Sequence, residues 1–370
     1  MSDEAASPGE PLWAAKVVPV PPPPIGLEDA EELAQRLGWV PTPVEEIEDE
    51  ILAVDEDRRH PQTKEERMGV PTLTDSGLET WLVFHREVNL PHFAAFPLLE
   101  DSAGRDLLAE YFRDHTRVAA SIQADIVLET PTWRANPDWA ALLGYDSEAL
   151  DRVNRDAVLF LRDLASEFET ANVIVSGNIG PRGDGYNPAE QLTPDVAEAY
   201  HRPQIEAFAA AGADRVTMLT ATHPGEPIGV VRAATAVVIP VVIAFTVETD
   251  GRLPNGQMLH EAIEEVDAAT ERAALHFGIN CAHPDHFAAA LEVASPAIRR
   301  VELLRANASR ASHAELDEAD ELDDGDPVEL GALYAQLARS HPHLRVLGGC
   351  CGTDVRHVEA IARACAPRAP

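Results

Sequence analysis

The chain has 370 residues and a net charge of −34, and only two of its 29 basic residues are lysines, Lys16 and Lys64. Nucleic acids and anionic membranes bind clustered Lys and Arg, so this balance argues against both as partners. No apolar run approaches the roughly 20 residues that cross a bilayer, and the acidic start "MSDEAASPGEPLW" lacks a secretory pattern, so we expect a cytoplasmic protein.

Residues 1–70 differ in composition from the rest of the chain. They contain the proline run "VPVPPPPIG" and the acidic runs "EEIEDE" and "DEDRR", with one short amphipathic helical pattern between them at 27–40. We predict an N-terminal extension over residues 1–70, to which the sequence assigns no chemistry, followed by one domain over residues 71–370.

From residue 71 onward, short apolar runs rich in β-branched residues alternate with longer helical periods. Eight runs predict strands, at 71–77, 125–132, 173–180, 215–220, 241–248, 276–281, 300–309 and 344–351. Among the helices between them, the one over 192–213 is predicted to have Thr193 as N-cap and a kink at Pro203.

Eight strand and helix alternations over some 290 residues match a closed parallel (β/α)8 barrel, the TIM barrel. The alternative is an open doubly wound sheet. Such a sheet usually has a glycine-rich phosphate turn after its first strand, whereas the first turn here reads "TDSGLETWL", without G-x-G-x-x-G spacing. We therefore predict the barrel, which places its site on the loops that follow the strands.

Three of the four cysteines follow predicted strands: Cys281 ends the sixth, and Cys350 and Cys351 end the eighth. One strand separates these positions in a closed barrel, so the three sulfurs converge at its mouth and predict a Zn²⁺ site with one open position. Glycines at 348, 349 and 352 would let the backbone turn both adjacent sulfurs toward one ion. The alternatives are a buried, inert Cys281 and a redox-active disulfide between the adjacent pair.

Two motifs in this order resemble the homocysteine S-methyltransferase family: "GINC", residues 278–281, and "GGCC", residues 348–351. The resemblance implies a zinc-binding barrel whose three ligands are these cysteines. It also implies that Asp75 and Gly77, in the first loop "TDSGLET", help to hold the amino-acid end of homocysteine. We predict Asn280 and Thr220 as further substrate-binding residues. The chain departs from the family at Thr220, because many members have a glutamate there that meets the substrate amine.

The resemblance also implies the reaction, which is transfer of a methyl group from an onium donor to homocysteine, giving methionine. We expect S-methylmethionine as the donor, with Glu129 and Trp133 near the mouth attracting and stacking its cation, and Glu248 and Asp250 as further acidic residues. Both partners are small molecules, a thiol and a methyl donor. Two alternatives stay open at this point: a zinc methyltransferase acting on another thiol or selenol, and a non-catalytic thiol/disulfide redox protein. The oligomeric state is not fixed by the sequence.

Overall fold

The computed structural model describes residues 70–168, 171–183, 185, 191–317, 319 and 321–366. The predicted N-terminal extension lies outside these ranges except for its last residue, so the boundary at residue 70 stays a prediction. Within the described residues, none of the helices is both long and apolar enough to cross a membrane.

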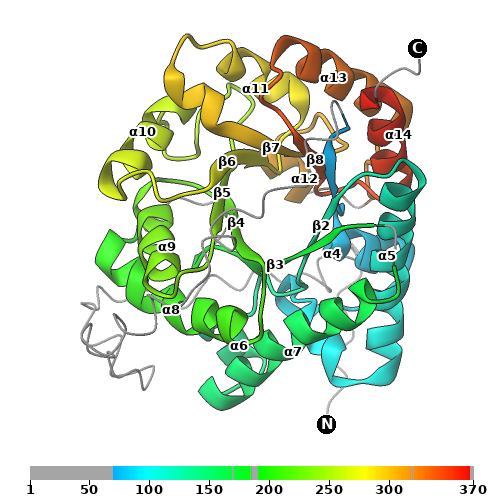
Figure 1. Cartoon of the computed structure of the whole chain (residues 1–370), viewed down its shortest axis with the longest axis vertical. Helices are drawn as coiled ribbons and strands as arrows, with labels where there is room; N and C mark the ends of the chain where they lie inside the picture. The colour runs from blue at the N-terminus through cyan, green and yellow to red at the C-terminus, as the bar shows by residue number, and fades with distance from the viewer. Residues whose placement is uncertain are drawn as a thin grey trace.

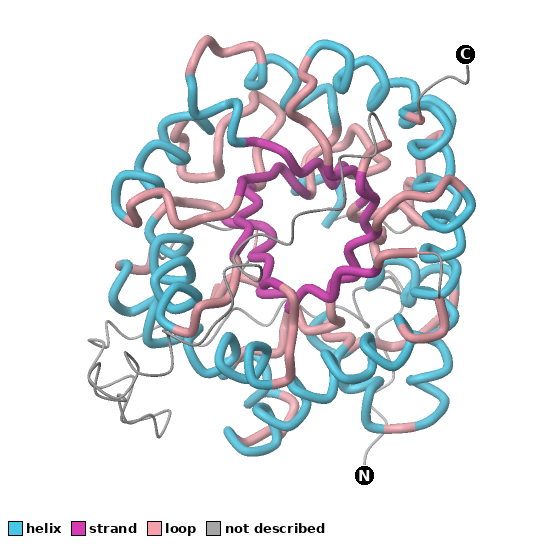
Figure 2. Tube along the Cα trace, in the orientation of Figure 1, coloured by secondary structure: helices cyan, strands magenta, loops and turns pink. Residues whose placement is uncertain are grey.

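Eight parallel strands form a closed barrel in chain order, and β1 pairs with both β2 and β8. Each lies within or overlaps one of the eight predicted runs, which confirms the predicted (β/α)8 fold. Figure 2 shows the strands as a single ring inside a ring of helices. Their bounds are Thr72–Thr74 (β1), Ile126–Glu129 (β2), Val173–Ile179 (β3), Arg215–Ala221 (β4), Val241–Phe245 (β5), His276–Asn280 (β6), Val301–Ala306 (β7) and Val346–Gly349 (β8).

Helices cover the outside of the barrel (Figure 1). The main ones are α5 (Ser102–Ser121), α6 (Pro137–Leu142), α7 (Ser147–Ala165), α8 (Pro194–Ala210), α9 (Gly225–Ala236), α10 (Leu259–Ala269), α11 (Pro284–Leu291), α13 (Pro327–Ser340) and α14 (Val355–Cys365). Shorter helical segments are α4 (Leu78–Thr80), the π-helix η1 (Trp81–His85), α12 (His313–Asp317) and the 3-10 turns η2 (Pro91–Phe93), η3 (Phe96–Glu100) and η4 (Pro296–Arg300).

Helix α8 tests two local predictions. The Thr193 side chain accepts a hydrogen bond from the Val196 backbone N–H, which confirms the predicted N-cap. The helix runs through Pro203 without a break, so the predicted kink does not interrupt it.

Two apolar layers hold the barrel together. The larger core lies between strands and helices, and a smaller one fills the barrel interior with Val127, Leu219, Val242, Ala244, Leu303 and Val346. Successive side chains of a strand point to opposite faces, so Glu129 and Arg305, each two residues beyond an interior position, also point inward. The barrel interior therefore holds charged side chains as well as this apolar cluster.

Candidate functional site

The three cysteines meet at the mouth of the barrel. β6, β7 and β8 are neighbours, and the sulfur atoms of Cys281, Cys350 and Cys351 all lie within 4.8 Å of one another. The Cys281 and Cys351 sulfurs are 3.4 Å apart. The Asn280 side-chain amide lies 3.9 Å from the Cys350 sulfur. Thiols from two places some seventy residues apart thus form one cluster.

Left-handed backbone conformations and close packing of glycines position these three sulfur atoms. Cys281 has φ 58° and Gly352 has φ 77°, so each reverses the chain where its strand ends. Gly348 and Gly349 have a different role from the predicted one, because neither has a positive φ. A Cβ at Gly348 would lie 1.8 Å from Thr74 Oγ1, and one at Gly349 would lie 2.0 Å from Thr353 Oγ1. They allow close packing, and Gly352 supplies the turn.

The cluster fits a tetrahedral metal ion. Ligand sulfurs about 2.3 Å from a zinc ion stand roughly 3.8 Å from each other, a value compatible with sulfurs that all lie within 4.8 Å of one another. Hydrogen bonds from the Cys281 and Cys351 thiols lower the pKa of the Cys350 thiol. The same contacts raise the pKa of Cys351, because a second thiolate would stand beside the first. Three thiols this close therefore ionise together only when a cation neutralises them.

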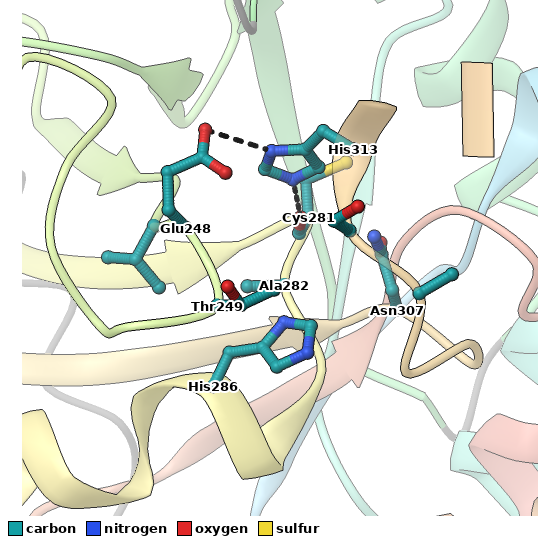
Figure 3. Close-up of a pocket in the computed structure, with 10 residues that line it drawn as sticks. Glu248, Thr249, Cys281, Ala282, His286, Asn307 and His313 are labelled. Atoms are coloured by element: carbon teal, nitrogen blue, oxygen red, sulfur yellow. Dashed lines mark hydrogen bonds and ion pairs between the residues drawn. The ribbon is translucent and has the colours of Figure 1, made fainter. Parts of the chain in front are cut away.

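A buried histidine supports Cys281 from outside the cluster. His313 lies in α12, and its Nε2 is 2.6 Å from the Cys281 carbonyl oxygen. Its Nδ1 is 3.5 Å from a carboxylate oxygen of Glu248, which follows β5 (Figure 3). Through these two contacts His313, after β7, connects the loop after β5 with the backbone of Cys281 after β6. Most of the described acidic residues in the stretch after β7 are exposed, but His313 within it is buried.

Figure 3 also shows residues that line a small pocket on this side of Cys281. His286 lines it, and its Nε2 contacts the Arg310 carbonyl oxygen. His283 caps α11. Neither histidine joins the group of metal-ligating atoms among the described residues, so neither is placed as a fourth ligand.

A larger cavity opens beside the cysteines on the side of β1 to β4. It has about 570 Å³ of unoccupied space, partly open to solvent. All the predicted site residues line it: Asp75, Gly77, Glu129, Trp133, Thr220, Asn280, Cys281, Cys350 and Cys351. Sequence reasoning missed several others, notably Glu79, Phe93, Asn178 and Arg305.

Asp75 is already engaged within the protein. One carboxylate oxygen forms an ion pair with Arg305, and the other accepts a hydrogen bond of 2.8 Å from the Glu129 backbone N–H. Arg305 also donates to Thr74 Oγ1 and to the Ser76 carbonyl oxygen. Both charged groups are at most 3% exposed. An arginine inside the apolar run "VELLRA" was the one sequence signal for this pair.

Thr220 holds a strained conformation at the end of β4. Its φ is 65°, a region in which a β-branched residue is a marked outlier. Asn280 holds it from β6: its Oδ1 accepts from the Thr220 backbone N–H at 2.8 Å, and its Nδ2 donates to Thr220 Oγ1 at 2.9 Å. The pairing register of β4 with β5 shifts at this point. A neutral hydroxyl group is thus fixed at the cavity wall.

Glu129 and Asn178 carry buried acceptors without partners. The two carboxylate oxygens of Glu129 have no hydrogen-bond partner among the described residues. The same is true of the side-chain oxygen of Asn178. The nearest cation to Glu129 is Arg215, whose Nη2 is 3.8 Å away, beyond hydrogen-bond range. Burial raises the pKa of the Glu129 carboxyl and lowers that of Arg215. Glu129 lies in the barrel interior, deeper than the rim position expected from the sequence.

The remaining acidic and aromatic candidates have other neighbours. Arg134 stacks on Trp133 with its guanidinium carbon 4.1 Å from a ring centroid, so a cation already covers part of that aromatic surface. Glu248 faces His313, and Asp250 accepts from the Arg252 backbone N–H. Burial raises the pKa of Glu79, which lines the larger cavity, to about 7.

Comparisons with known proteins bear on this site. The family model for homocysteine S-methyltransferase matches residues 72–365. Homocysteine S-methyltransferase of Escherichia coli (strain K12) is 27% identical over 199 residues, a match that covers 50% of this chain and 62% of that protein.

Solved structures share the fold. The metallated form of the homocysteine methyltransferase MmuM from Escherichia coli superposes with a TM-score of 0.66 at 21% identity, covering 82% of this chain and 99% of that one. The oxidized form of the same protein gives 0.65, also at 21% identity, over 84% and 99%. With the family model matched over nearly the whole described barrel, the chain belongs to the homocysteine S-methyltransferase family.

Proposed function

We propose that this protein transfers a methyl group from an onium donor, S-methylmethionine, to homocysteine, giving methionine, with a zinc ion held by Cys281, Cys350 and Cys351. The observation that carries the proposal is the convergence of three thiols beside a cavity of small-molecule size, in a chain of this family. Soft sulfur donors favour zinc over hard cations such as Mg²⁺ or Ca²⁺.

A bound zinc ion would supply one thing, a lower pKa for the incoming thiol, which is about 8.5 when free. The chain's own residues do the rest. The left-handed turn at Cys281 and the packing at Gly348 and Gly349 hold the three sulfurs in place. Gly77 lets the first loop pass against the cysteine loop, because a Cβ there would lie 2.4 Å from the Cys350 carbonyl oxygen.

The reaction balances without a protein base. The homocysteine sulfur forms a bond to the methyl carbon, the bond from that carbon to the donor's positive sulfur breaks, and its electron pair stays with the donor as a neutral thioether. The thiol proton leaves to solvent. The acidic side chains Glu79 and Glu129 line the cavity, and such groups favour a cationic donor electrostatically.

The test is to incubate zinc-loaded protein with homocysteine and a panel of methylated sulfonium and ammonium donors, and to measure methionine by mass spectrometry. We expect methionine with S-methylmethionine and less with ammonium donors. Bound zinc without methionine from any donor would overturn the homocysteine assignment.

A second acceptor is favoured by one observation, the neutral Thr220 where many family members have a glutamate. The same incubation with other thiols and with selenols in place of homocysteine distinguishes the two. A methylated product from another acceptor at higher kcat/KM than from homocysteine would support this second function.

A further inference from the structure

The larger cavity contains an incomplete set of polar contacts. Buried polar groups in native proteins nearly always have partners, so a buried acceptor without one calls for an explanation. Three such atoms line this cavity, the two carboxylate oxygens of Glu129 and the Oδ1 of Asn178. Glu129 is 3% exposed and Asn178 is 8% exposed. All three are acceptors, so what is missing is a donor.

The two residues are close in the barrel. β2 and β3 are adjacent, with Glu129 paired in register with Ser176, and Asn178 lies two residues further along the same face. Asn178 is fixed by its backbone, since its N–H donates to Thr130 Oγ1 and its carbonyl oxygen accepts from Thr132 Oγ1, both at 2.8 Å. The Glu129 backbone is fixed by Asp75. Both side chains therefore start from rigid positions.

The other polar groups at this level are satisfied internally. Both oxygens of Asp75 are engaged, by Arg305 and by the Glu129 backbone. Thr220 and Asn280 bond to each other. A ligand cation that enters this cavity therefore finds its unpaired deep acceptors on β2 and β3, away from the first and fourth loops.

From this geometry we propose that Glu129 and Asn178 bind the α-ammonium group of the amino-acid acceptor, an inference that rests on the proposed function. An ammonium has three N–H donors and one positive charge, which match three acceptor oxygens, two of which share the single negative charge of the Glu129 carboxylate. Asp75 and Glu129 each have an arginine nearby, but only Arg305 contacts its carboxylate closely. Arg215 stays 3.8 Å from Glu129, so an ammonium would supply the hydrogen-bonding cation that Glu129 lacks. Burial disfavours the ionised form of Glu129 in the empty cavity, and an ammonium restores it.

The first test measures binding and needs no turnover. Calorimetry compares methionine with 4-(methylthio)butanoate, which lacks only the amino group. We expect wild type to bind methionine about 10- to 100-fold more tightly, the contribution typical of charge-assisted hydrogen bonds. Glu129→Gln should remove most of that preference and leave the affinity for 4-(methylthio)butanoate within about 3-fold.

Two variants separate recognition from folding. Asn178→Leu should reduce the preference and Asn178→Asp, which keeps an acceptor oxygen and adds charge, should keep or increase it. Glu148→Gln, at an exposed position in α7, is the matched surface control and should leave the preference unchanged. If Glu129→Gln weakens both ligands equally, or if the preference survives it, the subsite assignment is overturned.

The second test uses the acceptors themselves, homocysteine and 4-mercaptobutanoate, with kcat/KM measured for each. The ratio of kcat/KM for homocysteine to kcat/KM for 4-mercaptobutanoate should fall in Glu129→Gln and Asn178→Leu. It should be kept or increased in Asn178→Asp and unchanged in Glu148→Gln. Failure of wild type to methylate either thiol counts against the proposed function alone, because the calorimetric comparison still decides where an ammonium binds.

Discussion

The two sides of the barrel mouth are built in different ways. The sulfur side, at the ends of β6 and β8, consists of two short contiguous motifs whose residues act together on one point. The charged side, from β1 to β4 with Arg305 reaching across from β7, consists of single residues on separate strands. A site for a metal can thus be specified in a few adjacent residues, whereas a pocket for a substrate depends on how strands are placed.

This comparison predicts an all-or-none loss on the sulfur side. Cys281→Ala should leave two sulfurs, too few to hold a metal ion firmly, so zinc content should fall well below one per chain and methyl transfer by at least about 100-fold. Elemental analysis and methionine formation measure the two effects. Cys365→Ala is the matched control, because that thiol lies in α14 outside the cluster. Full zinc content in Cys281→Ala would remove the basis of the metal site.

On the charged side, the largest effect should be on stability. Arg305→Met would leave the Asp75 carboxyl group 2% exposed and without its ion pair, at a cost of about 3–5 kcal/mol in the free energy of unfolding. Urea denaturation measures it. The double variant Asp75→Asn with Arg305→Met should recover much of the loss, because no unpaired charge remains. Arg310→Met, which removes an exposed arginine, should change little. A small effect of Arg305→Met would show that the pair is dispensable.

Variants of His313 test whether metal affinity depends on residues other than the three cysteines. His313→Ala removes the donor to the Cys281 carbonyl oxygen, and we expect metal affinity to fall about 10- to 100-fold. Competition with a chelator measures the affinity, and the absorption of a cobalt-substituted sample reports the ligand geometry. His313→Gln, which keeps an N–H donor, should recover part of the loss. His286→Ala, in the same small pocket, should not alter the affinity. Equal affinities for His313→Ala and wild type would confine the metal site to its three ligands.

The charged side continues below Glu129 to Arg215 and His276, and pH should reveal it. Burial, followed by the charge of Arg215, lowers the pKa of His276 from 6.5 to about 3. Between these two pKa values, His276 binds a proton in the unfolded chain but stays neutral in the folded chain. Its contribution to the free energy of unfolding should therefore decrease below pH 6.5 by about 1.4 kcal/mol per pH unit. The decrease should end near the folded pKa of about 3.

Urea denaturation at pH 7.5 and pH 5.5 measures this slope. His276→Gln should show a smaller loss between the two pH values than wild type. The same loss in both proteins would mean that His276 is not held neutral by its surroundings.

Local patterns were sufficient for the fold. Buried parallel strands such as "VVIAF" are continuous apolar runs, and their alternation with helical periods is visible without tertiary information. The N-cap at Thr193 was equally local, because a cap depends on a hydrogen bond within three residues. A kink at Pro203 is predicted because a proline removes a helical hydrogen bond; the helix continues through this residue, and the kink itself stays a prediction.

The charged side could not be derived in the same way. Glu129 was placed among residues that attract the donor, but its depth depends on the neighbouring strands. Asn178 and Arg305 lie at strand ends on the site face, but the sequence assigned a role to neither, because an orphaned acceptor or an occupied carboxylate exists only once the partners are in place. His313 lay in a stretch whose acidic composition favoured solvent.

The sequence by itself determined the barrel and the three sulfurs that cluster at its mouth, because strand periodicity and adjacent motifs are short-range properties of the chain. Tertiary structure alone decided which cavity groups are free to meet a substrate. Pairing Asp75 with Arg305 joins residues 230 positions apart, and only barrel closure brings β1 and β7 to that distance. Which charges remain unpaired is a property of the closed ring, because electrostatic pairing depends on distance in space and not on distance along the chain.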